Sequence, residues 1–313
     1  MVDGLSIVIP TINNEKVLQP LIDSIEKQEC DFAVEIIVVN NAKNNPIQIV
    51  LKNTQLQLMC IDSLPGVNNA RNLGLLMAKN EIVLFLDDDC RLLHPKTLFS
   101  HLERHRSRPE LFAVGGGYAV PHGTSFFNQL YNSMQMQWLY SNYLSFETQE
   151  TGCLIGGHFS IKKNQTKEFN IQFDASISYG GSEVSFFRDA HFLGLKMILL
   201  DFRVLHQTNE NFYSLTKKNY KQGKNHFLSE KKHNTINFNY SLDKYTQENK
   251  RNVNSTTKII LINYFNLIYW WSAYQNKKQI QKFFKHFAKD FSFLLSRKRD
   301  AFRSRLLRAL NKP

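Results

Sequence analysis

Three consecutive aspartates, Asp87, Asp88 and Asp89, directly follow the largely apolar run EIVLFL. Adjacent carboxylates repel one another, and their pKa values rise unless a cation offsets the repulsion. Mg²⁺ and Mn²⁺ suit oxygen ligands and commonly take one or two carboxylates, with substrate phosphates and water in the remaining positions. In an extended chain Asp87 and Asp89 point to one side and Asp88 to the other. The pattern predicts a divalent metal held against a phosphate-bearing ligand, and the alternative is a solvated acidic turn.

Two further groups could take part in chemistry. Ser182 and Glu183 follow a Gly-Gly pair and begin a stretch with apolar residues at helical spacing. Exposed N–H groups at a helix start favour oxygen-bearing and anionic side chains, so capping alone would explain both residues. His206 ends a short apolar run, and it is either a metal ligand or a structural histidine.

The elements that must position these groups alternate between strand and helix patterns. Continuous apolar runs at 5–11, 34–41, 56–62 and 81–89 predict buried strands. Apolar residues at helical spacing predict helices within 15–28 and 66–80. This order predicts an α/β fold, with a mostly parallel sheet and helices on its faces.

The polar strand ends are expected to converge. Ligands of open parallel sheets bind beyond the carboxyl ends of the strands. Thr11 ends the first predicted strand, Asn40 and Asn41 end the second, and the three aspartates end the fourth. We therefore expect one crevice that receives all of these side chains.

The charge is distributed unevenly along the 313 residues. Residues 214–313 carry 22 Lys and Arg against five acidic residues, whereas residues 1–213 carry 17 against 22. The whole chain is 42% hydrophobic and 21% charged, which is ordinary for a folded protein. We expect a slightly acidic globular domain in the first two-thirds of the chain and a basic appendage, which faces something anionic, in the last third.

Cysteine usage and the first residues favour an intracellular protein. The four cysteines are widely spaced and form no C-x-x-C pair, which is typical of reduced thiols (Cys30, Cys60, Cys90 and Cys153). The start, MVDGLSIVIPT, has no basic region before its apolar run, so no signal peptide is expected. The expected location is the cytoplasm, free or peripheral on the inner face of the cell membrane.

Two segments of the basic third are rich in apolar residues. The segment 258–274 is short for a membrane span and is interrupted by Asn263 and Asn266, so no span is predicted. The segment 277–310 places apolar residues at three- and four-residue steps between lysines and arginines, which predicts one or two basic amphipathic helices. Such helices either bind an anionic membrane surface or pack on the catalytic domain or on another subunit.

Seven stretches, in this order, resemble the family 2 glycosyltransferases with a GT-A fold, which is a Rossmann-like arrangement. They are SIVIPTINNEKVLQPLIDSI, EIIVVNNAKNN, GVNNARNLGL, EIVLFLDDDC, GGHFSIKK, FDASISYGGSEVSFFRDAHFLGLK and VLHQ. The resemblance covers about residues 4–225, so it implies a catalytic domain over 1–225, followed by a basic, aromatic-rich helical extension over 226–313. It implies an inverting, non-processive transferase that uses a nucleotide-diphosphate sugar, most often UDP-linked, and Mn²⁺ or Mg²⁺. The implied acceptor is a hydroxyl of a saccharide or lipid-linked sugar, in cell-envelope polysaccharide or glycolipid synthesis.

The resemblance also implies roles for individual residues. The residues implied to hold the nucleotide sugar are Pro10, Thr11, Glu15, Asn40, Arg71, Asp87 and Asp88. The implied metal ligands are Asp89, the main one, with Asp87 and His206. Glu183 is the implied general base, and the residues implied on the acceptor side are Gly157, His158 and Ser182. Aromatics in the loops around 117–160 would either stack on a sugar or fill a core.

Three positions depart from the family pattern. Asn40 and the following Asn41 replace a common aspartate. An asparagine amide would hold an imide N–H of the nucleotide base less firmly than a carboxylate does. Ser182 replaces the first acid of a Glu-Asp pair, and His158 stands where asparagine is common. The Q-x-x-R-W motif of processive members is absent, which favours addition of one sugar at a time.

Three other functions fit the sequence less well. A sugar-nucleotide pyrophosphorylase would need a Gly-rich, basic loop after the first strand, and PTINNEKV is not one. A nucleic-acid-binding protein would fit the basic third, but the sequence has no recognised nucleic-acid-binding signature, so no nucleic acid partner is expected. A transferase-like scaffold without activity is disfavoured by the retained acids and His206.

Overall fold

The computed structural model describes residues 4–12, 15–42, 49, 51, 56–121, 123–177, 181–233 and 256–274. The chain divides into two compact units, Met1–Leu215 and Thr216–Pro313. The boundary predicted at 225/226 falls further along the chain, inside the helix α7 (Phe212–His233). All four cysteines are free thiols.

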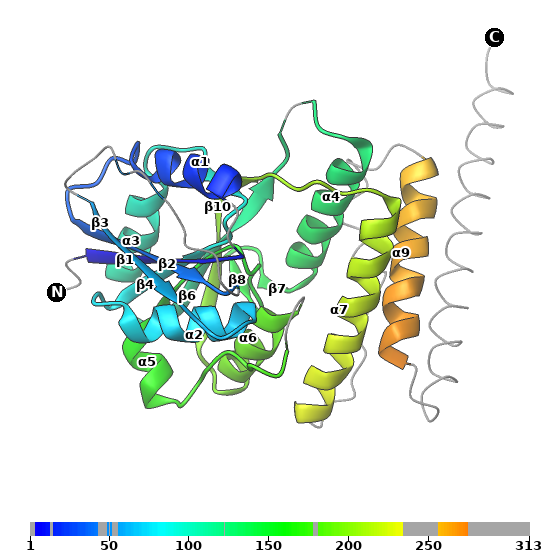
Figure 1. Ribbon diagram of the computed structural model, residues 1–313. Coiled ribbons are helices and arrows are strands. Elements are labelled where there is room, and N and C mark those ends of the chain that lie inside the picture. Colours follow the sequence, from blue (N-terminus) through cyan, green and yellow to red (C-terminus); the bar gives the residue numbers. More distant parts are fainter. Residues whose placement is uncertain are drawn as a thin grey trace, which may run out of the picture. The chain divides into compact units, whose positions relative to one another are not determined.

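One mixed, mostly parallel sheet forms the centre of the first unit (Figure 1). Its strands are β1 (Gly4–Thr11), β2 (Ala33–Asn40), β3 (Gln57–Asp62), β4 (Ile82–Leu86), β5 (Cys90–Leu92), β6 (Leu111–Ala119), β7 (Tyr143–Ser145), β8 (Glu150–Thr151), β9 (His158–Lys162) and β10 (Lys196–His206). The order across the sheet is β3-β2-β1-β4-β9-β6-β10-β8-β7, and β5 pairs with β10. The predicted α/β fold is therefore confirmed.

The first four strands run parallel, as their continuous apolar runs predict. Every residue of β1 and β4 is buried, and β2 is buried from Val34 onward. In register, Thr11 pairs with Asn40, and Asn40 pairs with Asp62. The strand β4 ends at Leu86, so Asp87 follows at the same edge of the sheet. The polar ends of these strands thus lie side by side.

Helices cover both faces of this sheet. They are α1 (Glu15–Ile25), α2 (Val67–Met77), α3 (Thr97–Ser107), α4 (Phe126–Ser141), α5 (Lys163–Glu168) and α6 (Ser182–Phe192). The β1–α1–β2 and β3–α2–β4 crossovers run in opposite directions along the sheet. Since such crossovers are right-handed, α1 and α2 lie on opposite faces, as Figure 1 shows. The helix α2 packs closely, because a Cβ at Gly74 would collide with Val8 of β1.

The aromatic stretch expected in loops around 117–160 is largely regular structure. Residues 126–141 form α4, and residues 143–145 and 150–151 form two short strands. Ser125 begins α4 by accepting a hydrogen bond from the backbone N–H of Asn128. Trp138 and Tyr140 pack against the core. For these two aromatics the core-filling alternative holds.

Three buried histidines join α3 to β9. Nε2 of His101 lies 3.0 Å from Nε2 of His158, and its Nδ1 lies 2.8 Å from the hydroxyl of Ser160. Nε2 of His105 lies 2.9 Å from the same hydroxyl. Burial lowers the pKa of His105 to about 3 and that of His158 to about 4, and it places the pKa of His101 well below its usual value. All three rings are therefore neutral in the folded protein at neutral pH.

In the second unit, α7 and α9 (Thr256–Tyr274) lie side by side (Figure 1). A Cβ at Gly223 would collide with the backbone oxygen of Tyr269, so only glycine permits this approach. Within the described residues, none of the helices combines the length and hydrophobicity that crossing a membrane requires. The predicted basic helices at 277–310 lie outside the described residues.

The histidine cluster predicts how stability depends on pH. The folded pKa values lie below the unfolded value of about 6.5, so the unfolded chain binds protons first as the pH falls. The free energy of unfolding should therefore decrease from pH 6.5 to pH 5, by up to about 1.4 kcal/mol per pH unit for each histidine. Urea unfolding at several pH values measures this slope.

A matched pair of variants assigns the effect. His105→Gln keeps a hydrogen-bond donor for Ser160 and removes one titrating group, so its slope should be shallower than that of the wild type. His191→Gln changes an exposed side chain and should leave the slope unchanged. An unaltered slope in His105→Gln would contradict the assignment.

Candidate active site

The three aspartates lie in a turn rather than in an extended chain. The backbone N–H of Cys90 donates to the carbonyl of Asp87 at 3.0 Å, and the chain then returns as β5. The strand β5 pairs with β10 so that Cys90 faces His206. This pairing brings the end of β10 next to the aspartates, which point to three different partners.

Arg71 of α2 is the cation at the centre of this site. Its guanidinium lies 3.2 Å from Oδ1 of Asp87 and 4.0 Å from Oε2 of Glu183, and it donates to the carbonyl of Gly156 at 2.9 Å. The side chain is only 3% exposed. In this structure it links two of the acidic side chains. The contact of Arg71 with the nucleotide, which the resemblance implies, stays a prediction.

Gly156 and Gly157 allow the acidic groups to approach each other. A Cβ at Gly156 would lie 2.8 Å from Nη2 of Arg71, and a Cβ at Gly157 would lie 2.6 Å from Oδ2 of Asp87. The N–H of Gly157 also donates to the hydroxyl of Tyr118 at 3.1 Å. A methyl group at either position would therefore displace the end of a side chain of the site.

Glu183 lies in the first turn of α6, which begins at Ser182 as predicted. The preceding Gly181 has a φ of 75°, a left-handed conformation that glycine adopts readily. The Glu183 carboxylate is 18% exposed and points toward Arg71. Its position near Arg71 shows that it does more than cap its own helix. The side chain of Ser182 lies outside the described residues.

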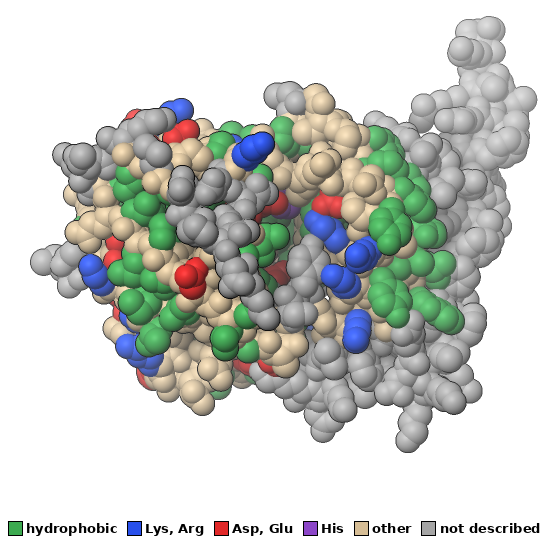
Figure 2. Space-filling view, viewed as in Figure 1, with side chains coloured by type: hydrophobic (Ala, Val, Ile, Leu, Met, Phe, Trp, Pro, Cys, Tyr) green, Lys and Arg blue, Asp and Glu red, His purple; other side chains and the backbone are tan. Residues whose placement is uncertain are grey.

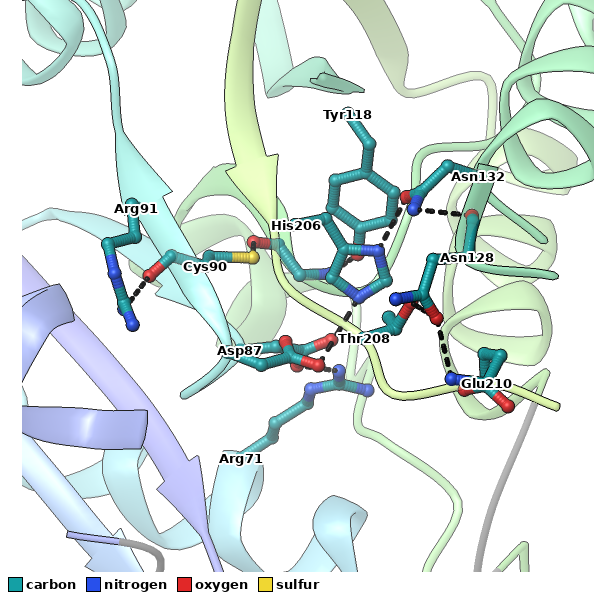
Figure 3. A network of polar contacts seen from close by, with 12 residues as sticks. Arg71, Asp87, Cys90, Arg91, Tyr118, Asn128, Asn132, His206, Thr208 and Glu210 are labelled. Carbon is teal, nitrogen blue, oxygen red and sulfur yellow. Dashed lines mark hydrogen bonds and ion pairs between the residues drawn. The ribbon is translucent and has the colours of Figure 1, made fainter. Parts of the chain in front are cut away.

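His206 is held from three sides (Figure 3). Its Nδ1 lies 2.8 Å from Oδ1 of Asn132, and its Nε2 lies 3.4 Å from Oδ2 of Asp89. The ring of Tyr118 stacks on it, with centroids 4.0 Å apart and planes inclined by 18°. The imidazole is therefore fixed in position with one nitrogen directed at a carboxylate.

The side-chain oxygen and nitrogen atoms around Asp89 are suitable ligands for a divalent metal. Oδ1 of Asp89 is buried and has no hydrogen-bond partner in the described part of the chain, although its Oδ2 faces His206. Burial raises the pKa of Asp87, against the lowering effect of Arg71, and raises the pKa of Asp88 to about 7. A cation would stabilise the ionised forms of both. Carboxylate oxygens and an imidazole nitrogen are ligands that Mn²⁺ and Mg²⁺ accept.

The protein groups alone do not form a closed metal cage. Among the described residues, no group of three His, Cys, Asp or Glu side chains is arranged as a complete metal site. Mg²⁺ usually keeps several waters and binds through one or two carboxylates plus substrate phosphates, so a partial set of protein ligands is sufficient.

The residues expected on the nucleotide side lie along the ends of β1 and β2. Oγ1 of Thr11 donates to Oδ2 of Asp88 at 2.6 Å. The amide of Asn40 donates to Oδ1 of Asp62 at 2.8 Å and accepts from the N–H of Ala42 at 3.0 Å. The Pro10 residue is buried within β1, and Glu15 begins α1 with its side chain outside the described residues. Their contacts with a nucleotide stay predictions.

The position of His158 differs from the expectation of an acceptor contact. Its side chain is fully buried, and its ring faces His101 of α3. The ring is thus enclosed between α3 and its own strand, and a role of His158 on the acceptor side stays a prediction. Its neighbour Gly157 contacts Asp87, so that half of the motif does lie at the site.

Sequence reasoning missed Tyr118, Asn128 and Asn132. Tyr118 follows three glycines near the end of β6, and the two asparagines lie one helical turn apart on α4. That four-residue spacing was the available signal, since it places two amides on one face of a helix.

A family model described as glycosyl transferase family 2 matches residues 6–169. The chain is 30% identical over 115 residues to an uncharacterized glycosyltransferase, YfnE, of Bacillus subtilis. It is 35% identical over 96 residues to a GalNAc(5)-diNAcBac-PP-undecaprenol beta-1,3-glucosyltransferase of Campylobacter jejuni. These matches cover 35% and 28% of this chain and 29% and 30% of the relatives, so the chain spans less than a third of either relative.

The fold resembles that of a mannosyltransferase of Pyrobaculum calidifontis, solved in complex with GDP-Man and Mn²⁺. The TM-score is 0.52 at 15% sequence identity, over 95% of this chain and 80% of that chain. The likeness supports the GT-A arrangement of the sheet, and at this identity it concerns the fold alone.

The glycine pair predicts a matched test of the packing of the site. Gly157→Ala should lower the free energy of unfolding by about 1–3 kcal/mol, because the new methyl group meets Asp87 and Tyr118. Gly152→Ala, whose Cβ would meet only ordinary contacts at 3.7 Å or more, should change it by less than about 0.5 kcal/mol. Urea unfolding compares the two, and equal effects would count against a close approach at Gly157.

Proposed function

We propose that this chain, which belongs to glycosyl transferase family 2, transfers a single sugar from a nucleotide-diphosphate sugar, UDP-linked in the simplest case, to an acceptor hydroxyl with inversion. The observation that carries the proposal is the convergence of Asp87, Asp89, Glu183 and His206 around Arg71 and the two glycines. The transferred group would be a hexose or an N-acetylhexosamine.

The acceptor is proposed to be a saccharide or a lipid-linked sugar. The Campylobacter relative is named for a substrate carried on undecaprenol diphosphate, which supports a role in cell-envelope polysaccharide or glycolipid synthesis. The basic segment 277–310 lies outside the described residues. Its binding to an anionic membrane surface, and a peripheral location on the inner face of the membrane, stay predictions.

Asp89, Asp87 and His206 are the residues that would hold Mn²⁺ or Mg²⁺. The structural relative was solved with Mn²⁺, and the buried, unpartnered Oδ1 of Asp89 supports an ion at this place. When bound, such an ion neutralises charge that develops on the diphosphate leaving group.

Glu183 is the proposed general base. Its carboxylate would accept the proton of the acceptor hydroxyl as that oxygen attacks the anomeric carbon from the face opposite the leaving group. A single displacement without a covalent intermediate inverts the anomeric centre, as in inverting glycosidases.

Arg71 is proposed to hold the base and a metal ligand at a fixed separation. Its guanidinium contacts Glu183 and Asp87 at once, and a planar fork of donors suits two carboxylates. Removing this cation would leave both acids without a compensating charge, so their positions depend on it.

One test of the proposed function concerns the metal. Wild-type protein should show a rise in melting temperature with one nucleotide-diphosphate sugar only when Mn²⁺ or Mg²⁺ is present, because the ion links the diphosphate to Asp89. Asp89→Ala should lose this metal-dependent shift. The exposed Asp201→Ala should keep it. If no nucleotide sugar binds under any metal condition, the chain is not a transferase and a scaffold role takes its place.

Another test separates binding of the sugar donor from the transfer step. Glu183→Gln keeps the shape of the side chain and removes its basicity, so the donor should still bind with near wild-type affinity. Transfer to an acceptor should fall by about 10²–10⁴-fold. Release of nucleoside diphosphate measures transfer, and calorimetry measures donor binding. A variant that transfers at the wild-type rate would exclude Glu183 as the base.

A further inference from the structure

Two asparagines of α4 bind the end of β10 and the segment after it (Figure 3). Asn132 contacts Nδ1 of His206 at 2.8 Å. Asn128 accepts a hydrogen bond from the backbone N–H of Glu210 at 2.6 Å and one from the hydroxyl of Thr208 at 3.3 Å. One face of α4 thus fixes both His206 and the chain that follows it.

The orientation of the Asn132 amide follows from its second contact. Its Nδ2 donates to the backbone carbonyl of Asn128 at 3.0 Å. Since the nitrogen is used there, the oxygen faces His206, and an amide oxygen only accepts. Nδ1 of His206 must therefore carry a proton.

The proton on Nδ1 also determines the state of the other ring nitrogen, Nε2, when the ring is neutral. In a neutral imidazole with a proton on Nδ1, Nε2 carries a lone pair. Nε2 points toward Oδ2 of Asp89 at 3.4 Å, which is longer than an ordinary N–H···O hydrogen bond. With a neutral ring, Nε2 and this carboxylate oxygen are both electron-pair donors, and they lie beside the unpartnered Oδ1 of Asp89. A cation at this place could bind both groups as ligands.

Asn132 is fully buried, and burying an amide costs free energy unless both its ends are hydrogen-bonded. Both ends are satisfied here, one by α4 itself and one by His206. The stacked Tyr118 fixes the ring plane, and Asn132 fixes the rotation within that plane.

We propose that Asn132 is a positioning residue that holds His206 in the Nδ1–H tautomer and directs Nε2 toward the metal. The inference rests on the proposed function, because it concerns the metal site of that reaction. It adds a residue outside the metal ligands, and it gives α4 a role in the chemistry. Groups that orient a metal-binding histidine typically change metal affinity by 10–100-fold when they are removed.

The test uses the full chain and Mn²⁺, with and without UDP, and measures free Mn²⁺ by electron paramagnetic resonance. Asn132→Leu removes the acceptor at similar volume and should weaken Mn²⁺ binding by about 10–100-fold. Asn132→Asp keeps an acceptor oxygen and should remain within a few-fold of the wild type. Ser133→Ala is the matched control on α4, since its hydroxyl donates to the carbonyl of Gln129 in the same helix.

A second measurement reads the tautomer without metal. Nitrogen-15 spectra of histidine-labelled protein at pH 8, assigned with His206→Gln, should show His206 with its proton on Nδ1. In Asn132→Leu this preference should be lost. A wild-type spectrum with the proton on Nε2 overturns the inference even if Asn132→Leu does not fold.

The outcomes separate the inference from the proposed function. Equal Mn²⁺ affinity in wild type and Asn132→Leu, with the same tautomer, overturns the role of Asn132 and leaves the transferase proposal intact. Absence of Mn²⁺ binding by the wild type in both conditions overturns the metal site itself. Weaker binding in Asn132→Leu, recovery in Asn132→Asp and a changed tautomer together support the inference.

Discussion

The site depends on one buried cation. The guanidinium of Arg71 lies between Asp87 and Glu183 and also binds the carbonyl of Gly156. These partners come from the end of β4, the start of α6 and the loop before β9, so one side chain joins segments far apart in the sequence. Like charges repel each other, so the two carboxylates would separate if the cation were absent. The geometry of the acids is therefore a consequence of where α2 places Arg71.

The topology of the sheet explains why other groups reach the same place. The antiparallel strand β9 lies between β4 and β6, and it begins just after Gly157, so the glycine pair lies at the edge where the parallel strands end. The pairing of β5 with β10 then brings His206 to Asp89. An irregularity in the β6–β10 register between Leu199 and Arg203 bends the long strand before it ends there.

The fold was largely predictable because buried parallel strands leave continuous apolar runs, and the polar residues that end them are conspicuous. The start of α6 at Ser182 and the end of β10 at His206 followed from the same patterns. A turn at the aspartates was one of the two alternatives, but the pairing of β5 with a distant strand, which places that turn at the site, was not predictable. Nor was the burial of His158, because its partner His101 lies on another element. Local patterns carry no information about such pairings.

The histidine cluster behind the sheet has a consequence for how this chain can vary. His158 directly follows Gly157 in the chain. Its Nε2 forms a hydrogen bond with Nε2 of His101, and the hydroxyl of Ser160 joins His101 to His105. Replacing His158 alone by a shorter side chain would leave Nε2 of His101 buried without a partner, which costs free energy. Substitutions at these four positions are therefore coupled, and homologous chains with asparagine at the position of His158 are expected to differ on the facing helix as well.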